Sequence, residues 1–239
     1  MELSILQIIA ALSAVSVGAF VQTAVGFGIA IIAAPILYLI EPQLVPVPII
    51  LASVTQTTLV LIFEGASARL DELKPAVFGH LPGVALGVWI LSISTQSQLA
   101  LGMGAAVLMA VAVSLLSKGI ASSKRNFFIA GALSGLMGST TGIGGPPIAL
   151  MFQHQSGPQL RANLAAFFTV AGGLSLAGIA LSGQVPKGAW SVGALFVPVV
   201  CGSFLLAKKL APPNISWARQ AILALSSFAG VVSILKGWA

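Results

Sequence analysis

The fold of this chain is decided by the stretch Ser139-Thr140-Thr141-Gly142-Ile143-Gly144-Gly145-Pro146-Pro147. This polar, glycine-rich stretch separates two short apolar runs, at 126–138 and 146–153. A second interruption, Gln22-Thr23-Ala24-Val25-Gly26-Phe27-Gly28, lies between apolar runs at 4–22 and 28–40. Glycine and proline are the poorest helix formers. Each interruption therefore marks a place where a helix is expected to break.

The composition around these interruptions places them in a membrane. Of 239 residues, 57% are hydrophobic and only 7% are charged, whereas soluble domains average about 25% charged residues. This excludes a soluble enzyme, a nucleic-acid binder and a disordered protein. Six further runs come close to the roughly 20 residues that a spanning helix needs; they are 43–63, 75–93, 98–117, 160–181, 189–207 and 217–236. The sequence predicts an all-α polytopic membrane protein.

The two interruptions also repeat at a fixed offset. A shift of 116 residues takes Gly26 to Gly142 and Gly28 to Gly144. The same shift takes Pro42-Gln43-Leu44 to Pro158-Gln159-Leu160, and Pro82 to Pro198. Three matches without a gap indicate an internal duplication. We expect an N-terminal repeat, 1–118, and a C-terminal repeat, 119–239, within one membrane domain.

The distribution of basic residues predicts the topology. An unbroken helix over 4–40 would be about 55 Å long, against a hydrocarbon core of about 30 Å. If each broken segment is a re-entrant hairpin followed by three crossing helices, nine basic residues share one side and two lie on the other. If each broken segment crosses once, the tally is seven to four. Ten crossings give the same sides as the hairpins, but the short arms argue against them.

The positive-inside rule therefore favours hairpins. Three crossings per half make the two repeats inverted, and they place both termini outside the cytoplasm.

Inverted repeats with broken helices are typical of secondary transporters, whose substrate site lies near the midplane. The first amides of a helix lack intrahelical partners and carry the positive end of its dipole, so two converging N-termini favour an anion. The candidate substrate-binding residues combine both interruptions with polar side chains of nearby spans: Gln22, Thr23, Gly26, Phe27, Gly28, Thr55, Gln56, Ser139, Thr140, Thr141, Gly142, Gly144, Gly145, Asn163 and Arg161.

Several of these residues have a second explanation. The glycines of the interruptions either bind substrate or permit close helix packing, which is the role expected for Gly83–Gly87 and Gly131–Gly135 with their GxxxG spacing. Thr55 and Gln56 either line a cavity or hydrogen-bond between helices. Arg161 is either a topology charge or a cytoplasmic gate for anions.

The sequence offers little for catalysis, metal binding or proton transfer. It has a single cysteine, and neither a metal-ligand cluster nor a nucleophile–base pair is recognisable, so we expect no catalytic residue, no metal and no cofactor. No acid lies deep in a span, and His80 and His154 are the candidates for a proton relay. This favours an anion that leaves the cytoplasm without a dedicated relay.

The motifs Gly26-Phe27-Gly28-…-Pro35 and Gly142-Ile143-Gly144-Gly145-Pro146 resemble the two repeats of the TauE/SafE permeases. The pair Leu81-Pro82-Gly83-…-Gly87 and Val197-Pro198-…-Gly202 shares this resemblance, which covers essentially the whole chain. The sequence departs from the usual pattern at Ile29-Ala30 and at Pro146-Pro147.

The resemblance implies a permease of the bacterial inner membrane that exports sulfite or an organosulfonate such as sulfoacetate by alternating access. Its partners would be the small anionic substrate and the lipid bilayer, without nucleic acid, and the GxxxG spacing permits a homodimer. The alternatives are an anion channel of similar architecture, or a transporter of sulfate, thiosulfate or a carboxylate.

Overall fold

The computed structural model describes residues 3–25, 28–65, 68–116, 121–152, 155, 157–210 and 216–238. Within these ranges the chain is helical and contains no strand. The elements are α1 (Ile5–Val25), α2 (Ile29–Ile40), the 3₁₀ turn η1 (Pro42–Leu44), α3 (Val47–Glu64), α4 (Leu70–Ile93), α5 (Gln96–Leu116), α6 (Lys124–Thr141), α7 (Gly145–Met151), α8 (Gly157–Leu181), α9 (Ala189–Leu210) and α10 (Ser216–Trp238).

Both interruptions break a helix, as the sequence predicts. Gly28 caps the start of α2 with φ 136°, a conformation that a side chain would strain. In the second half Gly142 caps the end of α6 in the left-handed region, with φ 75°. Gly144 is the N-cap of α7, 116 residues after Gly28, so the sequence offset relates two equivalent helix starts. Gly26 and Phe27 lie outside the described residues.

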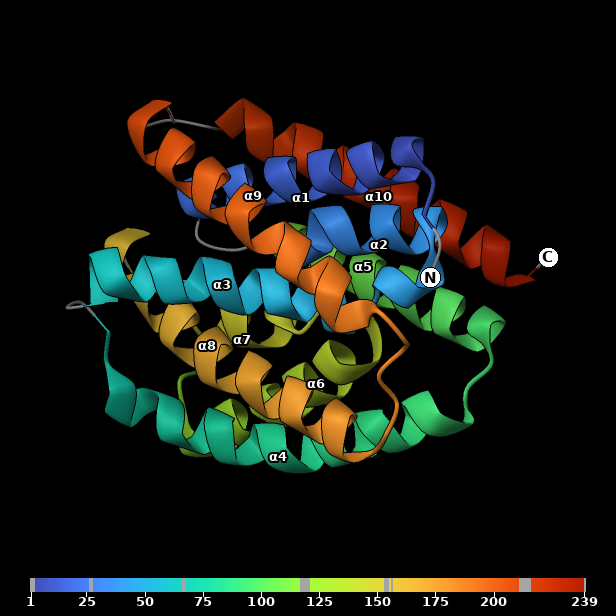
Figure 1. Cartoon of the computed structure of the whole chain (residues 1–239). Helices are drawn as coiled ribbons and strands as arrows, with labels where there is room; N and C mark the ends of the chain where they lie inside the picture. Colours follow the sequence, from blue (N-terminus) through green and yellow to red (C-terminus); the bar gives the residue numbers. More distant parts are fainter. Residues whose placement is uncertain are drawn as a thin grey trace.

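The returning arms α2 and α7 are short, at 12 and 7 residues, so each interruption produces a helical hairpin. Figure 1 shows α1 and α2 running antiparallel from the end of the molecule where both termini lie. The next three helices run along the molecule in alternating directions, so the α6–α7 hairpin starts from the opposite end.

Several contacts between helices stay the same when each helix is replaced by its counterpart in the other half. α3 packs against its counterpart α8, and α5 packs against its counterpart α10. The contact of α4 with α6 matches that of α9 with α1, and α4 with α8 matches α9 with α3. This pattern agrees with two equivalent halves, and their inverted orientation in the membrane stays a prediction. The boundary between 118 and 119 stays a prediction, because 117–120 lie outside the described residues.

Close glycine contacts join α4 to α6. A Cβ added at Gly83 would overlap the backbone of Ala132, and one at Gly131 would overlap the backbone of Ala76. The packing role expected for these glycines is therefore confirmed. These glycines pack helices of the same chain against each other, so their GxxxG spacing no longer supports a homodimer. The homodimer stays a prediction.

Apolar side chains cover the outer surface of the helices. Phe78 is 65% exposed and Leu205 is 59% exposed, which suits lipid rather than water. Five helices of the described chain are long and apolar enough to cross a membrane: Ile5–Thr23, Pro42–Glu64, Leu70–Ile93, Gly157–Leu181 and Ala189–Leu210. The all-α polytopic membrane fold is thereby confirmed.

The α4–α6 contact predicts a clear stability difference between two glycine variants. Gly83→Ala forces the two backbones apart, at an expected cost of about 1–3 kcal/mol. Gly202→Ala in α9 is the matched control, because nothing lies within 4 Å of the added methyl group. Thermal unfolding of the detergent-solubilised variants measures both. Equal melting temperatures would show that the α4–α6 contact is looser than described.

Candidate functional site

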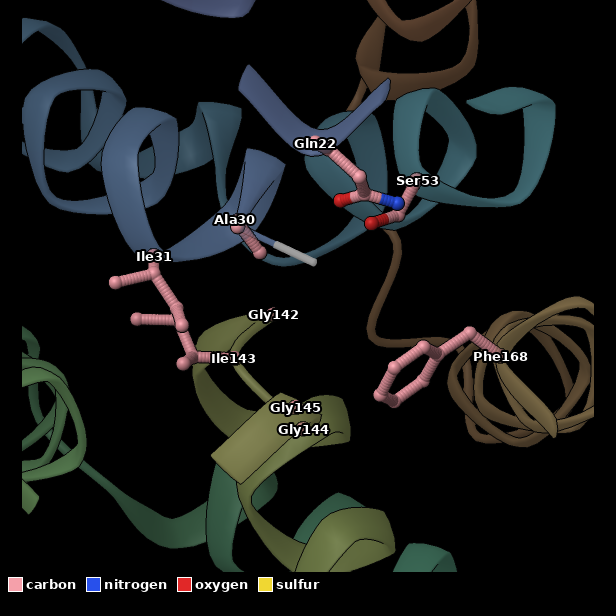
Figure 2. A pocket seen from close by; sticks show the side chains of 10 residues that line it. Gln22, Ala30, Ile31, Ser53, Gly142, Ile143, Gly144, Gly145 and Phe168 are labelled. Atoms are coloured by element: carbon pink, nitrogen blue, oxygen red, sulfur yellow. The ribbon is translucent and has the colours of Figure 1, made fainter. Parts of the chain in front are cut away.

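A cavity of about 50 Å³ lies where the two broken helices meet. Its lining residues come from α1, α2, α3, α8 and the second interruption: Gln22, Gly28, Ala30, Ile31, Ser53, Gly142, Ile143, Gly144, Gly145 and Phe168. In Figure 2, Gln22 and Ser53 lie on one side of this space, the Gly142–Gly145 segment lies opposite, and the Phe168 ring enters from α8. We call this space the central cavity.

The size of the central cavity suits a small ligand. One water molecule needs at least about 10–15 Å³ of such volume. A cavity of about 50 Å³ therefore has room for more than one water-sized group. The cavity is thus large enough for a small molecule and too small for a large one.

Gln22 and the start of α2 supply polar groups to the cavity. The Ile29 amide donates to Gln22 Oε1 at 2.9 Å, which orients the Gln22 side chain across the helix break. Its side-chain nitrogen and the Ser53 hydroxyl make no hydrogen bond within the described chain, so both are available to a ligand. The next amides of α2, from Ala30 and Ile31, belong to the first turn and have no intrahelical acceptor.

The second interruption contributes fewer donors than the first. Pro146 and Pro147 occupy the first turn of α7, and proline has no N–H group. The Ile143 amide donates to Thr141 Oγ1 at 3.3 Å, so the amides of Gly144 and Gly145 remain on this side. No charged residue is among the lining residues of the described chain. The central cavity is thus a neutral site of amides and one hydroxyl, bounded by apolar side chains.

Thr23 and Gln56 join α1 to α3 instead of lining the cavity. Gln56 Nε2 donates to Thr23 Oγ1 at 2.6 Å, and Thr23 Oγ1 donates to the carbonyl of Ala19 at 2.8 Å. Gln56 therefore fills the interhelical role that the sequence left open. The Thr55 hydroxyl donates to the carbonyl of Leu51 in its own helix at 2.9 Å.

The three hydroxyls before Gly142 bond back to their own helix. Ser139, Thr140 and Thr141 donate to carbonyls three or four residues earlier in α6, with shortest distances of 2.7, 2.8 and 2.7 Å. Such bonds are a common alternative to ligand contact for hydroxyls in helices. None of the three lines the central cavity.

Asn163 and Arg161 lie near the start of α8, away from the cavity. Asn163 accepts the Arg69 amide at 2.6 Å, and its side-chain nitrogen donates to Gln155 Oε1 at 2.7 Å. Arg161 Nε donates to Glu64 Oε2 at 2.7 Å in an ion pair whose side chains are 24% and 21% exposed. These contacts tie α8 to the end of α3 and to the start of α4.

His80 is also held by helix contacts. Its Nε2 lies 2.9 Å from the Ala171 carbonyl and 3.0 Å from Ser175 Oγ, both on α8. His80 does not line the central cavity. His154 lies outside the described residues. The described chain contains no group of three or more His, Cys, Asp or Glu side chains that could hold a metal ion.

Five lining residues of the central cavity were not among the predicted site residues: Ala30, Ile31, Ser53, Ile143 and Phe168. Two of them, Ser53 and Phe168, come from the long helices. The repeat held the signal, because Ser53 corresponds to Thr169 at the offset of 116 and Phe168 is its neighbour. The Thr169 hydroxyl donates to Thr57 Oγ1 at 2.9 Å, one turn along α3 from Ser53.

The Arg161–Glu64 pair predicts energetic coupling between α3 and α8. Arg161→Gln and Glu64→Gln each leave one charge without its partner, so the double variant is expected to lose less stability than the sum of both, by about 1 kcal/mol. Thermal unfolding of the four proteins gives the coupling. Arg69 and Glu72, with side chains 63% and 39% exposed, form the control pair and should show little coupling. Equal coupling in both pairs would contradict a structural role for Arg161.

Comparison with known proteins places the chain in a family. The family model described as sulfite exporter TauE/SafE matches residues 10–233. The chain is similar to the probable sulfite/organosulfonate exporter TauE of Cupriavidus necator, with 29% identity over 209 residues, which cover 82% of this chain and 81% of the relative. No solved structure gives a significant match. Because the family match includes both hairpins and every long helix, the chain belongs to the TauE/SafE sulfite exporter family of membrane transporters.

Proposed function

We propose that this protein is a permease of the cell inner membrane that exports a small sulfur oxyanion, sulfite or an organosulfonate such as sulfoacetate. The observation that carries this proposal is the convergence of Gly28 and Gly142–Gly145 on one cavity. Family membership and the printed activity of the similar protein of Cupriavidus necator support the choice of substrate.

The central cavity offers an oxyanion hydrogen bonds without a fixed positive charge. The donors are the amides of Ala30 and Ile31, the Gln22 side-chain nitrogen, the Ser53 hydroxyl and the amides of Gly144 and Gly145. The positive end of the α2 dipole favours an anion in front of these groups. A neutral site suits transport, because the anion has to leave it again.

The central cavity is small, at about 50 Å³. We infer that sulfite, the smaller of the two candidate substrates, needs less movement of the hairpins than sulfoacetate. Both would cross by alternating access, as the hairpins rock between the two sides.

The membrane potential can drive this export. An inside-negative potential favours the exit of an anion by about 2.3 kcal/mol per charge per 100 mV. With no acid lining the cavity in the described chain, no proton relay is part of the proposed mechanism.

The orientation follows from the ends of the helices. Arg69, Lys124, Arg161 and Lys208 belong to the end opposite the termini, whereas Lys187 and Lys236 belong to the end with the termini. The positive-inside rule makes the first end cytoplasmic. Trp89, Trp190 and Trp238 are 58%, 44% and 80% exposed near the other end, as expected of an aromatic belt.

Reporter fusions test this orientation. Alkaline phosphatase fused after Ala239 should be active, and a green fluorescent protein at the same place should stay dark, because the C-terminus is placed outside the cytoplasm. The same reporters fused after Lys208, at the cytoplasmic end of α9, should give the opposite result. A bright fluorescent protein after Ala239 would reverse the topology.

Variants of neighbouring hydroxyls on α3 test the central cavity. Ser53→Leu fills the cavity and should lower the initial rate of sulfite efflux at least about tenfold. Ser53→Ala removes one hydrogen bond to a charged ligand and should raise the half-saturating sulfite concentration about tenfold. The measurement is efflux from proteoliposomes at a clamped inside-negative potential, with sulfoacetate, sulfate and chloride for comparison.

Thr55 supplies the matched control for Ser53. It lies two residues along α3, and its hydroxyl bonds to its own helix instead of lining the cavity. Thr55→Ala and Thr55→Leu should therefore transport like the parent protein. Equal efflux by the folded Ser53→Leu protein would exclude the central cavity as the substrate site.

A further inference from the structure

A second cavity, of about 150 Å³, lies toward the end of the molecule that holds both termini. It is formed where α2 meets α3, where α4 meets α5 and where α8 meets α9. We call it the outer pocket. Its polar lining consists of Tyr38, Gln43, Gln96, Thr140 and Gln184.

Two separate segments lead from the outer pocket to the central cavity. On α3, Pro46 lines the outer pocket and Ser53 lines the central cavity, with Ile49 one turn before Ser53. On α6, Thr140 lines the outer pocket, and Gly142, just past its end, lines the central cavity. The two cavities therefore lie next to each other at these two segments.

A dry contact separates the two cavities. A Cβ placed on Gly142 would lie 2.6 Å from Ile49 Cγ2 and 3.9 Å from Val45 Cγ1. Ile49 and Ile143 are both fully buried, and Val45 is 7% exposed. The barrier is therefore apolar, and on the α3 side it is one side chain thick, with the bare backbone of Gly142 opposite.

The outer pocket favours anions through its amides and nearby cations. The side chains of Gln43, Gln96 and Gln184 make no hydrogen bond within the described chain and are free to donate. Lys236 Nζ lies 5.9 Å from the centre of the Tyr38 ring, and Lys187 directly follows the lining residue Pro186.

One carboxylate also lies beside this pocket. Glu41 precedes the lining residue Pro42, and it accepts the Gln43 amide at 3.2 Å. Among the described residues at this end, the charged side chains are therefore two ammonium groups, Lys187 and Lys236, and one carboxylate, Glu41.

We propose that the outer pocket is the exit site for the anion and that the contact of Ile49 with Gly142 is its closed gate. This inference rests on the proposed function, because it assigns a route to the exported sulfite or sulfonate. With about 150 Å³ against about 50 Å³, the outer pocket has room for the anion and part of its hydration shell. Opening requires the end of α6 to move away from α3 by the width of one side chain.

Cysteine labelling tests the gate without any substrate. Cys201 is the single cysteine of the chain, so Cys201→Ser gives a background in which Thr140→Cys and Ser53→Cys each carry one thiol. A membrane-impermeant methanethiosulfonate is applied from the non-cytoplasmic side, without sulfite, which would consume the reagent. Thr140→Cys should react at least ten times faster than Ser53→Cys.

Ile49 should control the labelling rate of Ser53→Cys, which is the slower of the two rates. Adding Ile49→Ala to the Ser53→Cys protein should raise the labelling rate of the thiol at position 53 about tenfold. Ile49→Val should raise this rate less, because valine keeps most of the isoleucine side chain. Ile62→Ala is the matched control, because Ile62 lies on the same helix and is 70% exposed. Melting temperatures identify any variant that fails to fold.

The charge of the reagent tests the anion preference of the outer pocket. At Thr140→Cys, a sulfonate-bearing reagent should react faster than a trimethylammonium reagent, once both rates are divided by those with a free thiol. Lys187→Gln together with Lys236→Gln should reduce this ratio.

Each other result has a distinct meaning. Equal labelling rates of Ser53→Cys and Thr140→Cys would show that Ile49 does not block access to the central cavity. A slow Ser53→Cys rate that Ile49→Ala leaves unchanged would place the gate elsewhere. Failure to label Thr140→Cys, or a preference for the cationic reagent, would exclude the outer pocket as an anion exit. The expected labelling in a protein that does not move sulfite would support the gate and overturn the proposed substrate.

Discussion

The structure depends on one constraint: backbone that leaves the helical conformation inside a bilayer has to be enclosed by protein or to line a wet cavity. The chain meets this constraint by placing its two interruptions against each other. Gly28 and Gly142–Gly145 come from segments more than a hundred residues apart, yet they line one small space. The long helices around them then act as a wall that keeps lipid away from the broken backbone.

Close packing of that wall explains the many glycines outside the interruptions. On α4 and α6 the glycines allow two backbones to touch, which holds the first arm of the second hairpin against a long helix. In lipid no hydrophobic driving force pulls helices together, so van der Waals contact at small residues and interhelical hydrogen bonds do so. The Gln56–Thr23 bond between α3 and α1 is an example of the second kind.

The parts of the structure that follow from local chemistry could be predicted from the sequence. The breaks, the short arms and the equivalent helix starts at Gly28 and Gly144 depend on glycine and proline, whose backbone preferences act at their own position. The lining faces of α3 and α8 could not be predicted, because helices that are apolar all round carry no pattern that marks an inner face. Ser53 and Phe168 were therefore missed, and Thr55 was chosen in place of Ser53.

Long-range partners account for the other differences. Arg161 and Asn163 have polar partners, Glu64 and the Arg69 amide, that lie 97 and 94 residues away in the chain. No local pattern announces such pairs. The hydrogen-bond partners of Ser139, Thr140 and Thr141 could not be predicted either. A hydroxyl in a helix either binds a ligand or donates to its own backbone, and the sequence does not distinguish the two.

The contacts on the two sides of the central cavity differ in their chemistry. At the offset of 116, the position equivalent to Ile49 is Ala165. Its side chain is buried but too short to make the contact that Ile49 makes with Gly142. From Ser53 toward the other end, α3 and α8 are joined instead by the Thr57–Thr169 hydrogen bond and then by the Arg161–Glu64 ion pair. A strict exchange of the halves would place Ala165 where Ile49 now stands. The repeats therefore share a backbone plan but differ in their side chains here, because Ile49 makes an apolar contact with Gly142 on one side and polar bonds join α3 to α8 on the other.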